Sequence, residues 1–327
     1  MQSKFSKVYK DAGPSFSTIK KWAALFKSGR TSLEDDAREG RPKIATTPEI
    51  IHQVHDIVLD DRRVKVKEIA DVLGISKERV GYILHKELNM RKLCARWVPH
   101  LLTIDQKRIR MRISQACLDR FHQNKMDFKR RFITVDETWI HHYTPERKEQ
   151  SKQWIEAGGN APKKAKRVPS AGKVMATVFW DYKNVLLIDY LQKGKTINSE
   201  YYCSLLDQLH AQIRIKRPAL KKKRIIFHQD NARVHTSVLT MAKFKELNYE
   251  LLDHPAYSPD LAPSDYYLFP NLKKFLAGKR FTSNDEAIAA VNGYFANLPE
   301  SHFNDGIELL KKRWNKCFEV SGDFIEK

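Results

Sequence analysis

The amino-acid sequence predicts a mixed α/β layer domain preceded by an all-α region. After residue 131, apolar runs of strand length occur first as a hairpin and then alternate with helical patterns, which is typical of α/β layers. Before residue 92, apolar residues recur only at helical spacing. A chain of 327 residues is long enough for one large core and smaller modules, so we expect two or three domains.

The charge of the chain indicates a polyanionic partner. Lysine and arginine total 59 against 39 acidic residues, and the net charge of +20 attracts phosphate backbones. Charge alone leaves a ribosomal protein or a membrane-surface binder open. No run approaches roughly 20 apolar residues, so no membrane-spanning segment is expected. The four cysteines are scattered without a CxxC pair, which favours reduced thiols over a zinc site or disulfides.

The first clear helical pattern lies near the N-terminus and has Ile19 and Trp22 on its apolar face. Lys20 and Lys21 lie off this face and are candidate DNA contacts. Residues 37–47 follow as a basic linker rich in Gly and Pro. Its Gly-Arg-Pro sequence can lie along a minor groove, which makes Arg41 a further candidate contact, although an ordinary basic linker fits equally well.

Residues 48–92 hold three successive helical patterns that predict a helix-turn-helix DNA-binding unit. Ala70 is small where two helices cross, Gly74 lies in the tight turn, and Val80 falls inside the second helix facing the first. The candidate recognition helix spans residues 76–85. Its exposed side chains are expected in the major groove, and the candidate DNA contacts are Lys77, Arg79 and Tyr82.

A linker and connecting helix are expected over residues 93–128, followed by the α/β domain over residues 129–327. Two basic segments in these regions could hold DNA. One is the connector with Arg108, Arg110 and Arg112, and the other is the run RPALKKKR at 217–224. Either segment could equally be an ordinary solvated surface.

Three aspartates stand at positions that suit metal-dependent chemistry. Asp136 and Asp230 each follow an apolar strand pattern, where a carboxylate needs a partner, and Asp265 follows a Pro-Ser helix start. If the three converge, their mutual repulsion raises their pKa values unless cations are present. Hard divalent ions with oxygen ligands resolve this conflict, and two such ions roughly 4 Å apart can activate water and stabilise a leaving oxygen.

Each of these residues also has an ordinary structural interpretation. An aspartate at a strand end or helix start usually serves as a hydrogen-bonding group, so the prediction depends on the set. Asp260 is a rival third carboxylate, but its position before Leu-Ala-Pro suits a turn, and we rank it as structural. For His235, capping of the following helix is favoured over direct catalysis.

The sequence blocks around these residues resemble those of a known family. VDETWIHHYTP, HQDNARVHT and YSPDLAPSDYYLFPNLK are similar to the signatures of the mariner branch of the Tc1/mariner transposases. The 34 residues between Asp230 and Asp265 match the spacing of that branch. WVPHLLT resembles its interdomain linker, and SFSTIKKWAALFKSGRTSLEDDAREGRPK resembles the end of its first helix-turn-helix and the following GRP arm.

The resemblance implies an RNase H-like catalytic domain and a cut-and-paste reaction at transposon ends, with integration at TA. It makes Asp136, Asp230 and Asp265 the ligands of two Mg²⁺ or Mn²⁺ ions, with Asn231 and His235 as supporting residues. The implied partners are double-stranded DNA, as transposon inverted repeats and target, and a second copy of the chain in a homodimer. No membrane and no small-molecule substrate are implied, and the nucleus is the expected location.

Two departures from the family pattern qualify this expectation. Residues 1–36 begin within the second helix of the first helix-turn-helix, so we expect this unit to be truncated and recognition of the ends to be weakened, because short helices depend on packing. Leu101 replaces an acidic residue of the linker block. A transposase-derived DNA-binding protein that no longer transposes is therefore the alternative, and a resolvase of the same fold is a second rival, disfavoured by the helix-turn-helix region.

Overall fold

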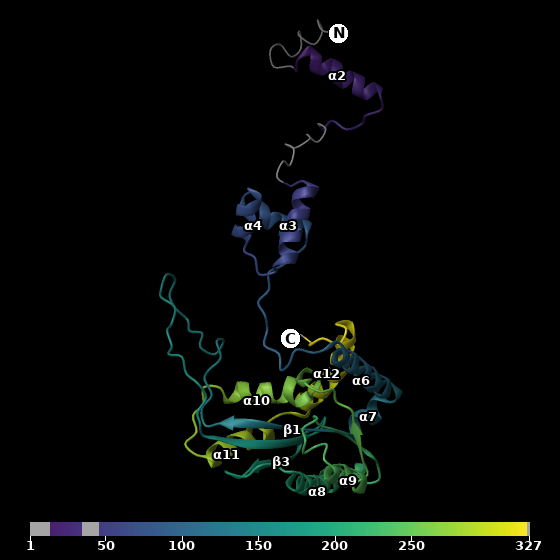
Figure 1. Cartoon of the computed structure of the whole chain (residues 1–327), viewed down its shortest axis with the longest axis vertical. Coiled ribbons are helices and arrows are strands. Elements are labelled where there is room, and N and C mark those ends of the chain that lie inside the picture. The colour runs from purple at the N-terminus through teal and green to yellow at the C-terminus, as the bar shows by residue number, and fades with distance from the viewer. Residues whose placement is uncertain (1–13, 35–45, 326–327) are drawn as a thin grey trace. The chain divides into compact units, whose positions relative to one another are not determined.

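The computed structural model describes residues 14–34 and 46–325 (Figure 1). The chain divides into two compact units, Met1–Ala95 and Arg96–Lys327. The candidate DNA contact Arg41 lies outside the described residues, as does most of the predicted linker over 37–47. None of the helices in the described ranges is both long and apolar enough to cross a lipid bilayer.

The first unit contains helix α2 (Phe16–Lys27) and a small bundle. The bundle is formed by α3 (Pro48–Asp60), α4 (Val66–Leu73) and α5 (Lys77–Tyr82), and a π-helical turn, η2 (Ile83–Glu87), continues α5. Ala70 and Val80 are buried in one apolar cluster with Val54, and Gly74 has a φ of 63° at the turn between α4 and α5. A left-handed φ favours glycine, so the turn depends on Gly74 as the sequence pattern requires.

The second unit is built on a five-stranded mixed sheet with the order β3-β2-β1-β4-β5. Strands β1, β2 and β3 form an antiparallel meander, whereas β4 and β5 run parallel to β1. The strands are β1 (Phe132–His141), β2 (Lys173–Trp180), β3 (Val185–Leu191), β4 (Ile225–His228) and β5 (Tyr249–Leu252). This α/β architecture confirms the predicted fold class, and β1 continues five residues past Asp136, which lies in mid-strand rather than at the strand end as predicted.

Helices cover both faces of the sheet (Figure 1). One face is packed by α6 (Ile104–Gln123), α7 (Lys125–Arg131), α10 (Phe269–Leu276), α11 (Asn284–Ala296) and α12 (Glu300–Glu319). The other face is packed by α8 (Ser199–Lys216) and α9 (Val238–Glu246). Because side chains alternate along a strand, Phe132 and Ile140 of β1 enter the first core while Ile133 and Val135 enter the second.

A long connection between β1 and β2, residues 142–172, extends away from the sheet (Figure 1). Its base continues the antiparallel pairing, since the His142 amide donates to the Gly172 carbonyl over 2.9 Å and the Tyr143 amide donates to the Ser170 hydroxyl over 2.9 Å. The Gly278 amide also donates to the Thr144 carbonyl over 2.8 Å, which ties the base of this connection to the residues that follow α10.

Candidate active site

The parallel pairing of β1 with β4 brings two of the predicted aspartates to one edge of the sheet. Thr134 of β1 is paired with His228 of β4. Asp136 and Asp230 each lie two residues further along the same direction. Asp136 is half-buried, whereas Asp230 is exposed just beyond the last residue of β4. The register of two neighbouring strands therefore sets the spacing of these carboxylates.

The third aspartate comes from a helical turn on the face packed by α10 and α12. Asp265 lies in η5 (Ser264–Leu268), which follows the short turn η4 (Pro259–Leu261). The indole of buried Trp180 donates to the Ser264 hydroxyl over 3.0 Å, and the Asp265 amide donates to the Ala262 carbonyl over 3.0 Å. These bonds anchor the turn to the end of β2 and leave the Asp265 side chain exposed.

Asp136 is the most electrostatically strained of the three groups. Burial raises its pKa well above the ordinary value, and the nearby charges of Asp265, Glu137 and Asp230 raise it further. The Glu137 amide, which donates to Oδ1 of Asp136 over 2.8 Å, partly offsets this. Burial likewise raises the pKa of Asp265, although Lys273 and a hydrogen bond with Asp136 oppose it. These two carboxylates are therefore adjacent, and a positive charge between them is electrostatically favoured.

Asp230 is held by a histidine. Nδ1 of His235 lies 2.6 Å from Oδ1 of Asp230, and the Ala232 amide donates to the same oxygen over 3.0 Å. Burial alone raises the pKa of Asp230, but the hydrogen bonds from His235 and Ala232 outweigh it and the pKa is lowered. Burial lowers the pKa of His235, yet its hydrogen bond to Asp230 and the nearby carboxylate of Glu137 raise it to about 9. The pair is therefore an imidazolium and a carboxylate.

The predicted capping role of His235 is wrong. Helix α9 begins at Val238, and its N-cap is Ser237, whose hydroxyl accepts from the Thr240 amide over 3.2 Å. His235 is instead 1% exposed and packs its ring against Tyr202, with 4.4 Å between the centroids. Ser237 satisfies the helix end because it is one residue before the first helical turn, which leaves the imidazole free to face Asp230.

Glu137 is the site residue to which sequence reasoning gave no role. Strand alternation turns Glu137 to the face opposite Asp136, and its Oε1 lies 3.5 Å from Nε2 of His235. Tyr202 lies on the same face, and its hydroxyl donates to Gln229 over 2.6 Å. Two features of the sequence could have indicated this contact. One is an acidic residue directly after a candidate ligand, and the other is a histidine a few residues after β4.

Asn231 supports the loop rather than pointing at the aspartates. Its amide Nδ2 donates to the His254 carbonyl over 2.7 Å, and Nδ1 of His254 lies 3.1 Å from Nε2 of His228. Burial lowers the pKa of His254 to about 4, so both imidazoles of this pair are neutral, and Thr134 contacts the other nitrogen of His228. These hydrogen bonds join the ends of β4 and β5 close to Asp230 in the chain.

The donor set at this edge suits hard divalent cations. It consists of oxygen ligands only, and burial with neighbouring negative charge disfavours the ionised form of one of them, Asp136, unless a cation is close. The three aspartates do not form a tight cluster of ligand atoms. Within the described ranges, the one group of three potential ligands whose atoms all lie within 4.8 Å is His52, His55 and Asp56 on the surface of α3. Asp136 and Asp265 are adjacent, and Asp230 is held separately by His235.

Asp260 is structural, as ranked from the sequence. It forms a two-bond ion pair with Arg110, at 2.9 and 2.7 Å, and Arg110 is fully buried. The prediction that Arg110 could hold DNA is therefore wrong, because the helical face that carries it packs against the loop of residues 258–260. Arg108 and Arg112 of the same helix are exposed.

The candidate DNA contacts of the first unit are mostly free of internal interactions. Lys20, Lys21 and Lys77 are exposed, and Tyr82 is 39% exposed. Arg79 is half-buried and donates to the Thr46 hydroxyl over 3.1 Å, with its guanidinium 5.5 Å from the Tyr82 ring centroid. Its side chain is thus already oriented along the helix surface before any DNA is bound. The contribution of these residues to DNA binding stays a prediction.

Comparison with known proteins identifies relatives along nearly the whole chain. Residues 144–223 match the family model described as a transposase with a partial DDE domain. The chain is 32% identical over 315 residues to the mariner Mos1 transposase of Drosophila mauritiana, covering 96% of this chain and 88% of the relative. It is also 33% identical over 311 residues to human histone-lysine N-methyltransferase SETMAR, covering 94% of this chain but only 44% of that longer protein.

Solved structures agree with the sequence comparison. The Mos1 paired-end complex with Mn superposes with a TM-score of 0.73 at 31% identity, covering 99% of this chain and 93% of that chain. A pre-cleavage Mos1 transpososome gives a TM-score of 0.72 at 30% identity, covering 99% and 92%. Fold, length and sequence agree from the helical units to the end of the α/β domain, and the latter is RNase H-like. The chain belongs to the mariner branch of the Tc1/mariner family of DNA transposases.

Proposed function

We propose that this chain excises and integrates DNA by a cut-and-paste reaction in which Asp136, Asp230 and Asp265 hold two divalent ions, Mg²⁺ or Mn²⁺. The observation that carries the proposal is the meeting of three carboxylates at one sheet edge, where burial and mutual repulsion hold the pKa of Asp136 well above its ordinary value. Mos1 has been solved as paired-end complexes with Mn and with Mg, which supports the choice of ions.

The residues of the chain set up this chemistry by orientation and charge. His235 binds one oxygen of Asp230 and so orients this carboxylate, and Glu137 and Tyr202 keep the imidazole in place. Ions bound at the three aspartates would activate water and stabilise the leaving 3′ oxygen when a phosphodiester is hydrolysed. In the second half of the reaction, the freed 3′ hydroxyl attacks a target phosphodiester at a TA step, forming one phosphodiester as another breaks.

The proposed partners are duplex DNA and a second copy of the chain. Mos1 has been solved as a paired-end complex with the left transposon end and as a strand transfer complex, which supports transposon ends and target DNA as substrates. A paired complex implies one chain per end, hence a homodimer. The first unit supplies the exposed basic residues Lys20, Lys21 and Lys77 for binding. Action on chromosomal DNA would require the protein to enter the nucleus.

The test is metal-dependent cleavage of duplexes that carry the inverted repeats flanking the coding sequence. Soluble protein should cut these duplexes with Mg²⁺ or Mn²⁺ and not with EDTA, and Asp230→Ala should abolish cutting while DNA binding persists. Titration calorimetry with Mn²⁺ should give two ions per chain. Binding of the ends without cutting under any metal condition would establish the alternative, a transposase-derived DNA-binding protein. A fluorescent fusion tests nuclear location.

A further inference from the structure

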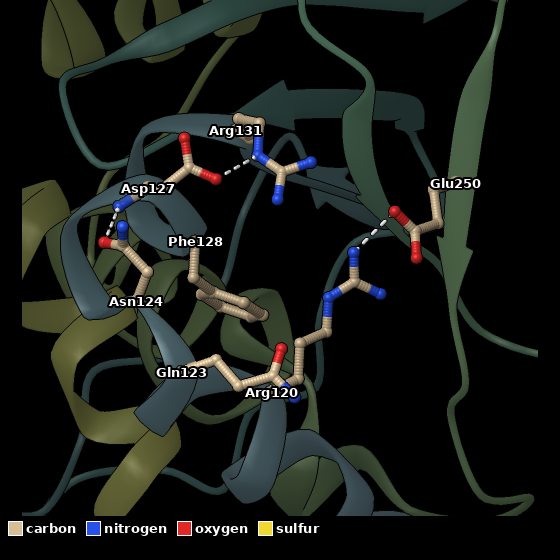
Figure 2. A pocket seen from close by; sticks show the side chains of 7 residues that line it. All are labelled: Arg120, Gln123, Asn124, Asp127, Phe128, Arg131 and Glu250. Carbon is tan, nitrogen blue, oxygen red and sulfur yellow. Dashed lines mark hydrogen bonds and ion pairs between the residues drawn. The ribbon is translucent and has the colours of Figure 1, made fainter.

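An arginine-lined pocket lies on the second unit, at the ends of the strands opposite to the aspartates. It encloses about 450 Å³ between the end of α6, α7 and β5. Figure 2 shows the guanidinium groups of Arg120 and Arg131 at the same opening, with Glu250 across from Arg120 and Asp127 beside Arg131. Phe128 forms the apolar floor, since its ring is buried in the core. The pocket is therefore a polar opening above a rigid apolar base.

Positive charge exceeds negative charge around this pocket. Arg120 pairs with Glu250 at 2.5 Å, and Arg131 pairs with Asp127 at 2.7 Å. Asp127 also forms an ion pair at 2.9 Å with Lys223, which belongs to the basic run before β4. The hydrogen bond from Arg120 lowers the pKa of Glu250. The positive charges of Arg120, Arg224 and Arg131 lower it further, so Arg224 of the same basic run is close to this carboxylate. Four cationic side chains thus face two carboxylates.

The arginines keep donors that the protein does not use. Among described residues, Arg120 makes one ion pair through Nη2, and Arg131 donates through Nε to Asp127 and through Nη1 to the Arg224 carbonyl. Nε and Nη1 of Arg120 and Nη2 of Arg131 have no partner within the described part of the chain. Both side chains are only about a quarter exposed, at 25% and 21%, so they are already ordered. Ordered guanidinium groups with spare N–H donors match the geometry of phosphate oxygens.

The pocket lies within reach of a duplex bound at the aspartates. Arg224 directly precedes β4 and Asp230 lies two residues after its end, so five residues, or six Cα-to-Cα steps, separate them. At roughly 3.3 Å per residue this is about 20 Å. Six base pairs of B-DNA, at 3.4 Å of axial rise for each strand position, span roughly the same length. The pocket and the aspartates are therefore about as far apart along β4 as six base pairs along a duplex.

We propose that this pocket, formed by Arg120, Arg131 and the adjoining Lys223 and Arg224, binds a backbone phosphate of the DNA substrate about half a helical turn from the phosphodiester that is cut. Glu250 and Asp127 occupy the arginines until the phosphate arrives. The inference rests on the proposed function only in taking duplex DNA as the substrate, and it gives a place on the α/β domain to the basic run that the sequence singled out at 217–224.

Binding measured without metal tests the pocket separately from catalysis. Fluorescence anisotropy of a labelled duplex is followed in EDTA with the full chain, over a series of salt concentrations. Arg120→Gln and Arg131→Gln should each weaken binding about 3- to 10-fold and reduce the slope of log K against log salt by about 1, because one phosphate contact is lost. Lys243→Ala is the matched control, because this paired lysine on α9 lies on the other face of the sheet and should leave the slope unchanged.

Glu250→Gln separates phosphate binding from a structural role. It breaks the same ion pair as Arg120→Gln, so a merely structural pair predicts the same effect from both variants. The proposal predicts opposite effects, with Glu250→Gln tightening DNA binding about 2- to 5-fold because Arg120 is released. Parallel melting curves identify any variant that fails to fold, and the other variant of the pair then decides.

Several outcomes would overturn the inference. If Glu250→Gln weakens binding as Arg120→Gln does, or if neither changes it, the pocket binds no DNA phosphate. If Glu250→Gln increases the affinity for inorganic phosphate but not for duplex, the pocket takes a free anion instead. In each of these cases wild-type cleavage persists, so the proposed function stands. Failure of the wild type to bind or cut any duplex sinks the proposed function and this inference together.

Discussion

His235 and Asp230 are joined by a 2.6 Å bond between Nδ1 and Oδ1, and this pair links the two faces of the sheet edge. Asp230 faces the opening that holds the other aspartates, whereas His235 is buried beside Tyr202 and Glu137 on the face packed by α8. Because the imidazole binds one carboxylate oxygen, the orientation of the other is set by a buried residue. Residues that orient a metal ligand without binding the metal themselves commonly change the metal affinity strongly when they are substituted.

His235→Ala should reduce cleavage about 10- to 100-fold and raise the Mn²⁺ concentration needed for half-maximal rate, since Asp230 loses its orientation. His235→Asn should restore much of the rate, because the amide nitrogen lies near the position of Nδ1. The measurement is the cleavage rate over a Mn²⁺ titration for the three proteins. Equal loss in both variants at saturating metal would contradict a positioning role for the imidazole.

Asp136→Asn should stabilise the metal-free protein by about 1–2 kcal/mol while abolishing cleavage. The neutral amide removes a buried carboxylate whose pKa burial raises well above the ordinary value, and each tenfold shift in proton affinity corresponds to about 1.4 kcal/mol. Urea unfolding in EDTA measures the stability. Added Mn²⁺ should stabilise the wild type and not the variant, and a less stable variant in EDTA would show that Asp136 is not strained.

Arg110→Met should lower the free energy of unfolding by about 3–5 kcal/mol, because it leaves the Asp260 carboxylate buried without its partner. The Arg110 guanidinium also donates to the Gly322 carbonyl over 2.9 Å and to the Ser258 hydroxyl over 2.6 Å. The matched control is Lys107→Met, which removes the partly exposed pair with Asp323 and should cost no more than about 1 kcal/mol.

Asp260→Asn distinguishes the two carboxylates of the η4–η5 loop. It should destabilise the fold, since Asp260 accepts from Arg110 and from the Ile325 amide, but leave the heat of Mn²⁺ binding unchanged. Asp265→Asn should do the reverse, with little change in stability and loss of metal binding. Loss of metal binding in Asp260→Asn, measured below its melting temperature, would make Asp260 a ligand.

The stability of the metal-free protein should fall as pH rises from about 6.5 to about 9. The folded protein raises the pKa of His235 from 6.5 to about 9 and therefore binds a proton more tightly than the unfolded chain. Its contribution is full below pH 6.5 and is lost as pH rises through the folded pKa, to a total of about 3 kcal/mol. Unfolding by urea in EDTA at several pH values measures this, and the slope should be smaller in His235→Asn, where only the raised pKa values of Asp136 and Asp265 still contribute.

The fold class, the family and the three candidate aspartates could all be predicted from the sequence. These follow from local information: strand and helix periods, the glycine at the α4–α5 turn, and the 34 residues between Asp230 and Asp265. A residue next to a predicted strand end can be placed from the sequence, because the direction and pairing of the strand determine where the chain leaves the sheet. The net charge of +20 likewise indicated a nucleic-acid partner before any contact was known.

Which polar side chains meet could not be predicted from the sequence, because it depends on how distant segments pack. His235 was expected to cap α9, but Ser237 takes that place and the imidazole joins Asp230 to Glu137, 98 residues away in the chain. Arg110 was grouped with DNA-binding arginines, but packing of α6 against the loop of residues 258–260 buries it with Asp260. The pocket of Arg120 and Arg131 in Figure 2 likewise depends on α6, α7 and β5 meeting. A charged side chain has the same sequence signature whether it faces water, DNA or a buried partner, so packing alone separates these cases.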